Sequence, residues 1–140
     1  MYCSQADLEK RLDPQVLRAL TDDDGDGLAD TAVIDAAIAD ADALIDTYLR
    51  ARYVVPLNPV PDAVRSISAA VAIYFLLTRR HEIVPAEHLK RYESAMQLLD
   101  HLSRGEISLN ASQPTESPHL PQSSREADER TFDEESLENY

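Results

Sequence analysis

The chain has 140 residues, and its 26 aspartates and glutamates outnumber its 13 lysines and arginines, giving a net charge of −13. This length suits one domain, and the charge excludes a protein that binds nucleic acid mainly by neutralising phosphates. The single cysteine, Cys3, rules out an intrachain disulfide and a cysteine-rich metal site. A reduced, cytosolic origin fits this cysteine usage.

No membrane segment is expected. The acidic start MYCSQADLEK lacks the basic region and apolar run of a secretory signal. The longest apolar stretch, Ala69–Leu77, is far shorter than the roughly 20 residues that span a bilayer. We therefore interpret this stretch as part of a buried helix.

Two short helices are predicted near the N-terminus by their capping patterns. Ser4 with Asp7 three residues later resembles a capping box. Asp13 followed by Pro14 places a capping side chain before a proline at the first helical position, where no hydrogen bond is lost.

A long helix is predicted from about Asp30 to Tyr53. Its apolar residues recur at spacings of three and four and form one stripe, whereas its acidic residues fall largely off that stripe. The members of the stripe are Ile34, Ile38, Ala41, Ile45, Tyr48 and Leu49.

Two more long helices follow the proline-rich segment 54–61, which cannot continue a helix. The first, from Asp62 to about Arg80, is apolar on most of its circumference and is expected to be surrounded by other elements. The second runs from Pro85 through Ser103, and Gly105 supplies its stop. Its expected stripe is Leu89, Tyr92, Ala95, Met96, Leu99 and Leu102.

The composition changes near Asn110. We predict that EISLN, residues 106–110, forms a short strand and that residues 111–140 form a tail rich in Pro, Ser and Glu, with a net charge of −6 from eight acids and two bases. The predicted fold is all-α: a small bundle of three longer helices plus short N-terminal helices in residues 1–110, with an extended acidic C-terminal tail that docks on a partner.

The segment TDDDGDGLAD, Thr21 to Asp30, resembles a calcium-binding loop. Ligands at positions 1, 3, 5 and 9 would be Asp22, Asp24, Asp26 and Asp30, and Gly27 stands at position 6. Position 12, which needs a bidentate carboxylate, is Val33. Two interpretations remain: a turn in which Asp30 caps the long helix, or a weak Ca²⁺ site in a helical interaction module.

No catalytic constellation is apparent. The four histidines, His81, His88, His101 and His119, form no metal-binding pair, and we expect them on helix surfaces. The sequence contains no nucleophile motif and no phosphate-binding glycine loop. We predict that the chain is not an enzyme and, apart from possible Ca²⁺, needs no cofactor.

Several motifs in residues 1–110 resemble one family in order and spacing. They are IDTYLRARYVVPL (45–57), VP (60–61), AIYFL (72–76), RYESA (91–95) and GEISL (105–109). With these motifs, the chain resembles the small virion proteins of Mu-like phages and prophages, once known only as a domain of unknown function. The acidic loop is itself part of that family's pattern.

The resemblance implies a structural role as a head–tail connector, also called a head-completion or adaptor protein. Such subunits form a ring, usually of twelve copies, that binds the portal protein and a tail-terminator or neck protein. The ring lies in the virion neck, between capsid and tail, after assembly in the host bacterial cytoplasm. DNA passes through its channel without specific binding.

A ring subunit needs a head-to-tail interface between copies. Arginine and tyrosine are enriched where proteins meet, and the resulting candidates in the body are Arg50, Arg52, Tyr53, Arg79, Arg80 and Arg91. The other possibility for Tyr53 is a place in the core, and for the arginines a role at helix C-termini. In the tail, Phe132, Leu137 and Tyr140 are the expected anchors on a partner. The other possibility is a solvated, disordered tail.

Overall fold

The computed structural model describes residues 1–80 and 83–110, and these residues form five helices without a strand. The all-α prediction is confirmed. The helices are α1 (Gln5–Glu9), α2 (Pro14–Thr21), α3 (Thr31–Leu49), α4 (Asp62–Arg79) and α5 (Ala86–Arg104). None of these helices is both long and apolar enough to cross a membrane.

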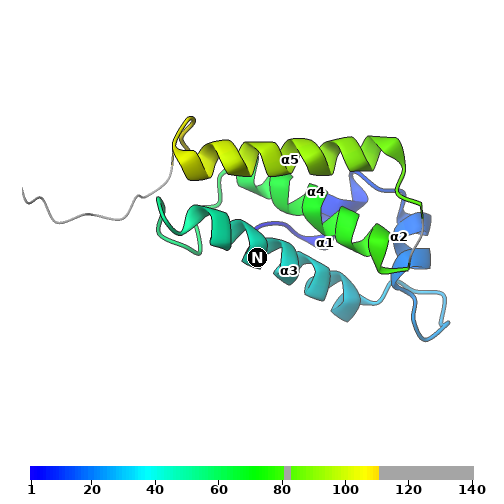
Figure 1. Cartoon of the computed structure of the whole chain (residues 1–140). Coiled ribbons are helices and arrows are strands. Elements are labelled where there is room, and N and C mark those ends of the chain that lie inside the picture. Colours follow the sequence, from blue (N-terminus) through cyan, green and yellow to red (C-terminus); the bar gives the residue numbers. More distant parts are fainter. Residues whose placement is uncertain (81–82, 111–140) are drawn as a thin grey trace, which may run out of the picture.

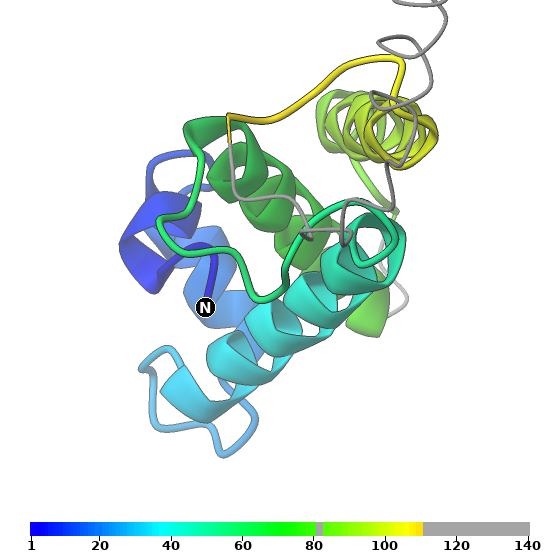
Figure 2. The ribbon, with the colours of Figure 1, turned by 90° about the vertical axis from the view of Figure 1, so that its left-hand side faces the viewer.

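Helix α4 lies at the centre of the bundle and contacts each of the other helices. The long helices α3 and α5 flank it, and α1 and α2 cover a further side (Figures 1 and 2). Nine residues of α4 are buried, compared with three of α5. This confirms that α4 is surrounded, whereas α5 packs through one face only.

Helix caps follow the sequence signals. The Asp7 carboxylate accepts the Ser4 N–H at 2.9 Å, which is one half of the capping box at the start of α1, and it also accepts a hydrogen bond from the Ser4 hydroxyl at 3.0 Å. Asp13 accepts from the N–H of Gln15 at the start of α2. Gly105, with φ 76°, forms the left-handed C-cap of α5, a conformation that a side chain would strain.

The predicted end of α3 was wrong. The helix stops at Leu49, not Tyr53, and residues 50–53 form a tight turn in which the N–H groups of Arg52 and Tyr53 both donate to the Leu49 carbonyl at 2.9 Å. This turn directs Tyr53 into the core, where 1% of its surface is exposed. The predicted strand at residues 106–110 is also wrong, since this segment has no strand partner among the described residues.

Every member of the two predicted apolar stripes lies in the core or packs against it, except Leu89. All members of the α3 stripe are buried except Tyr48, which is half-buried. In α5, Ala95, Leu99 and Leu102 are buried, whereas Leu89 is exposed. Tyr92 reaches α4 differently, by stacking its ring on Tyr74 with the ring centroids 3.8 Å apart.

Tyr2 and Cys3, near the start of the chain, lie in the core. Tyr2 is 4% exposed; its hydroxyl accepts a hydrogen bond from the N–H of Leu57 at 3.0 Å and donates to the Asp46 carboxylate. Its own N–H donates to Asp42, which also accepts from the Ser68 hydroxyl at 2.7 Å. The N-terminal segment thereby joins α3, α4 and the proline-rich connection, an arrangement that the sequence did not reveal.

Candidate interaction surfaces

The acidic loop between α2 and α3 is ordered by its own aspartates. The Asp22 carboxylate accepts hydrogen bonds from the N–H groups of Gly25, Asp26 and Gly27, at 2.8, 3.1 and 2.9 Å. Gly25 and Gly27 have φ values of 76° and 80°, which glycine adopts without strain. The loop therefore holds its shape through hydrogen bonds within the chain.

The candidate metal ligands fall into two groups. Carboxylate oxygens of Asp22, Asp24 and Asp26 lie within 4.8 Å of one another. Asp30 does not join them, because its carboxylate accepts the N–H of Ala32 at 2.9 Å and caps α3. Three clustered carboxylates are hard oxygen ligands of the kind Ca²⁺ uses, but Val33 cannot supply the twelfth-position ligand.

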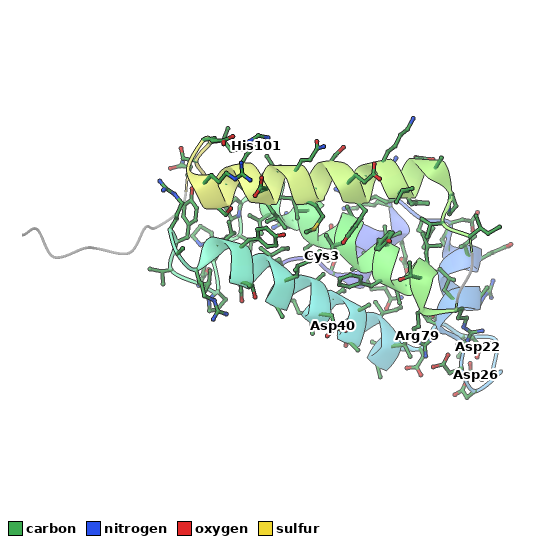
Figure 3. The ribbon with its side chains drawn as sticks, viewed as in Figure 1. Cys3, Asp22, Asp26, Asp40, Arg79 and His101 are labelled. Carbon is green, nitrogen blue, oxygen red and sulfur yellow. The ribbon has the colours of Figure 1, made fainter. Side chains whose placement is uncertain are left out.

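Two of the candidate interface arginines hold this loop. Arg79 and Arg80, at the end of α4, both pair with the Asp23 carboxylate, and Arg80 also donates to the Asp22 carbonyl at 2.9 Å. Figure 3 shows Arg79 next to the loop that carries Asp22 and Asp26. The hydrogen bond from Arg79, reinforced by Arg80, lowers the pKa of Asp23 below its ordinary value. Both arginines therefore have partners within the subunit.

At the opposite end of the bundle, Tyr53 and Arg52 also make contacts within the chain. The Tyr53 hydroxyl accepts a hydrogen bond from the N–H of Leu109 at 2.8 Å. The Arg52 guanidinium lies so close to Gly105 that a methyl group there would collide with it. Tyr53 therefore lies in the core and not at an interface, and its buried side chain offers no surface to a partner. Arg50 is exposed.

Arg91 borders a groove between α4 and α5, which we call the α4–α5 groove. Its volume is about 590 Å³, within the range of ligand-binding clefts. It exists because both helices carry small residues along the facing edge. These residues are Ala63, Ser66 and Ala70 on α4 and Ser94 and Ala95 on α5.

Three cations line this groove: Arg11, Lys90 and Arg91. Arg11 donates hydrogen bonds to the carbonyl and the hydroxyl of Ser66, at 2.9 and 3.2 Å. Of these three cations, only Arg91 was predicted from the sequence to be a contact residue. The small residues at positions 63, 66 and 70 recur at helical spacing and were the signal that could have revealed the groove.

A second groove, of about 400 Å³, lies between α3 and α4 near the acidic loop. Ala32, Ala36 and Phe75 form part of its apolar lining, and Asp40 and Arg79 supply charge. Figure 3 shows Asp40 and Arg79 on the same side of the molecule.

The remaining predicted residues divide between described and undescribed parts of the chain. His88 is half-buried, and His101 is exposed beside Glu106, with which it pairs. The candidate anchors Phe132, Leu137 and Tyr140 lie outside the described residues, as do His81 and His119.

These features define the class as a small all-α protein whose surface carries an anchored acidic loop and two grooves between helices. The family model described as Bacteriophage Mu, Gp36 matches residues 2–127, well beyond Asn110, where the resemblance was expected to end. The chain belongs to this family of Mu phage proteins.

Two relatives support the assignment. The chain is 31% identical over 116 residues to the Mu-like prophage FluMu protein gp36 of Haemophilus influenzae. The aligned region covers 83% of this chain and 80% of that protein. The chain is also 37% identical over 81 residues to Gene product J of Escherichia phage Mu. Here the aligned region covers 57% of this chain and 55% of that protein.

Proposed function

We propose that this protein is a structural virion protein of a Mu-like phage or prophage, and specifically a head–tail connector subunit. The observation that carries the proposal is the family match over residues 2–127. The order and spacing of the sequence motifs, which resemble those of connector proteins, support it.

In this proposal, copies of the chain form a ring, with twelve as the expected number, between the portal protein and a tail-terminator or neck protein. A closed ring requires two different surfaces on each subunit. The two grooves lie on different edges of α4, one beside α5 and one beside α3, and offer such surfaces. The exposed Arg50 at the end of α3 is a further candidate contact.

The net negative charge of the chain supports the proposal that DNA passes through the ring. A net charge of −13 per copy, multiplied around a ring, produces a field that repels phosphates. DNA would then slide through without being held. The proposed role needs no chemical reaction, and we therefore propose a structural rather than an enzymatic function.

Deletion of the gene from its phage tests this function. We expect the mutant to accumulate heads filled with DNA and separate tails, visible by electron microscopy, and the wild-type gene supplied in trans to restore joined particles. An Arg50→Glu variant should restore them poorly, whereas Arg104→Glu, which alters an exposed cation paired with Asp100, serves as the matched control. Normal tailed virions from the deletion mutant would refute the proposal.

A further inference from the structure

The α4–α5 groove combines an apolar floor with a positively charged rim. Ile67 and Ala95 are buried at its base, and Ala70 and Leu98 are half-buried beside them. Arg11, Lys90 and Arg91 supply the charge, and no acidic residue lines the groove in the described part of the chain. Such a lining favours a ligand that is both apolar and anionic.

The groove cations are only partly neutralised. Within residues 1–80 and 83–110, no carboxylate lies within 4.0 Å of the charged groups of Arg11 or Lys90, and Arg91 pairs only with the exposed Glu87 one turn away. An exposed pair of this type is weak. In a chain with twice as many acids as bases, three cations gathered around one groove that no acidic residue lines in the described part of the chain favour an anionic ligand.

The last thirteen residues of the chain have the complementary composition. Residues 128–140, DERTFDEESLENY, carry six acids and one base, together with Phe132, Leu137 and Tyr140. They begin directly after the part of the chain that the family model matches. We infer that residues 128–140 bind in the α4–α5 groove of their own chain, with the apolar side chains on its floor and the carboxylates at Arg11, Lys90 and Arg91.

The intervening segment is long enough for this contact. Ser94, in the groove, precedes the end of α5 by ten residues, which is about 15 Å along the helix. Residues 111–127 provide 17 residues, and a chain can span at most about 3.3–3.6 Å per residue. The number of residues is therefore sufficient for the distance.

Tethering also favours the chain's own groove over that of another copy. A flexible linker of this size gives the attached segment a millimolar effective concentration. Residues 128–140 would therefore occupy the groove in the free subunit and would have to leave before a neighbouring protein could use it. This inference concerns the free subunit and does not depend on the proposed connector role.

A single tryptophan tests the inference, because the natural chain contains none. In the full-length Phe132→Trp protein, we expect blue-shifted emission and several-fold weaker quenching by acrylamide than in the denatured chain. Both signals should stay constant as protein concentration rises from low to high micromolar. In 1 M salt, where the screening length is about 3 Å, the protection should weaken.

Charge reversal in the groove should release the segment. Adding Lys90→Glu and Arg91→Glu to Phe132→Trp should raise quenching to the denatured level while circular dichroism shows unchanged helicity. The matched control is Lys10→Glu with Arg104→Glu, at two exposed cations outside the groove, which should leave the protection intact. Ser94→Phe, which fills the groove from an exposed position, should release the segment without any change of charge.

Four results would overturn the inference. Full exposure of the indole in the Phe132→Trp protein at all concentrations would show that the segment does not dock. Protection that grows with concentration would place it on another copy, and protection insensitive to both groove variants would place it elsewhere on the chain. Binding of short duplex DNA that requires Lys90 and Arg91 but leaves the tryptophan signal unchanged would instead mark the groove as a phosphate-binding surface.

Discussion

The two ends of the helical bundle are held together by different chemistry. Where α3 and α5 end, the hydroxyls of the buried Tyr2 and Tyr53 accept the backbone N–H groups of Leu57 and Leu109. Where α4 ends, the exposed Asp23 holds Arg79 and Arg80. Buried hydrogen bonds leave a costly unsatisfied group when broken, whereas exposed ion pairs contribute little and are screened by salt.

The largest effect is expected from Tyr53. Replacing this buried ring by alanine should reduce the free energy of unfolding by about 3–5 kcal/mol, because it leaves a cavity. Tyr53→Phe keeps the ring and removes only the acceptor for the Leu109 N–H, at a cost of about 1–2 kcal/mol. Urea denaturation of both variants measures the difference. Equal stability of Tyr53→Ala and the wild type would show that Tyr53 does not occupy the core.

Tyr2 should give the next largest effect and a characteristic pH dependence. Burial, with the hydrogen bond to Asp46, raises the pKa of Tyr2 to about 12, compared with about 10 in the unfolded chain. Between these values the unfolded chain loses the proton first. The stability that comes from the neutral phenol is therefore complete below pH 10 and is lost as pH rises towards 12.

The variant Tyr2→Phe isolates this contribution. At pH 8 we expect it to be less stable than the wild type by about 1–3 kcal/mol, because the Leu57 N–H loses its acceptor. As pH rises through 10, the two unfolding free energies should converge, while titration of the other tyrosines affects both proteins alike. A constant difference from pH 8 to 12 would contradict a buried, neutral Tyr2.

Breaking the ion pairs of Asp23 should reduce the free energy of unfolding by less than the Tyr2 substitution does. The dependence on pH should be the reverse, because this contribution is lost as pH falls. Arg79 and Arg80 lower the pKa of Asp23, so their stabilisation is present above the unfolded pKa near 4 and disappears as pH falls through the folded value. Asp23→Asn should be slightly less stable than the wild type at pH 7 in low salt. The difference should vanish at pH 2 or in high salt.

Asp40→Asn is the matched control for that comparison, since Asp40 is exposed on α3 and forms no ion pair within the described residues. A stability loss in Asp40→Asn equal to that in Asp23→Asn would attribute the effect to net charge rather than to the two arginines. Thermal melts at a series of salt concentrations provide the measurement.

The smallest effect is expected from calcium. Because Val33 supplies no bidentate carboxylate, micromolar Ca²⁺ should leave the melting temperature of the wild type unchanged. Val33→Glu places a carboxylate at the missing position and should make the melting temperature sensitive to Ca²⁺, whereas Val33→Gln should not. Saturable stabilisation of the wild type by micromolar Ca²⁺ would show that Asp22, Asp24 and Asp26 suffice as ligands.

The two ends also show which features a sequence reveals. Caps and apolar stripes join residues three or four positions apart, so Ser4, Asp13, Asp30 and Gly105 could be assigned before the structure was known. The contacts that hold the ends of the bundle join residues more than 50 positions apart. No local sequence pattern predicts these contacts, because they depend on how the helices pack.

The candidate interface residues illustrate the same limit. Arg79, Arg80 and Arg52 were singled out by residue type alone, and the structure gives each of them a contact within the subunit. For Tyr53 the sequence left an interface and a core position open, because the tight turn after Leu49 that directs it into the core is not marked by glycine or proline. Arg91 does line a groove, but residue type did not identify its companions Arg11 and Lys90, because the packing of separate elements brings them together.

The proposed role in the neck is tested most directly by electron microscopy of virion necks from the phage that encodes this chain. We expect a closed ring of this helical chain, with α4 at the centre of each copy, between the portal and the tail. A reconstruction in which other proteins fill that position, together with virions that lack this chain altogether, would contradict it.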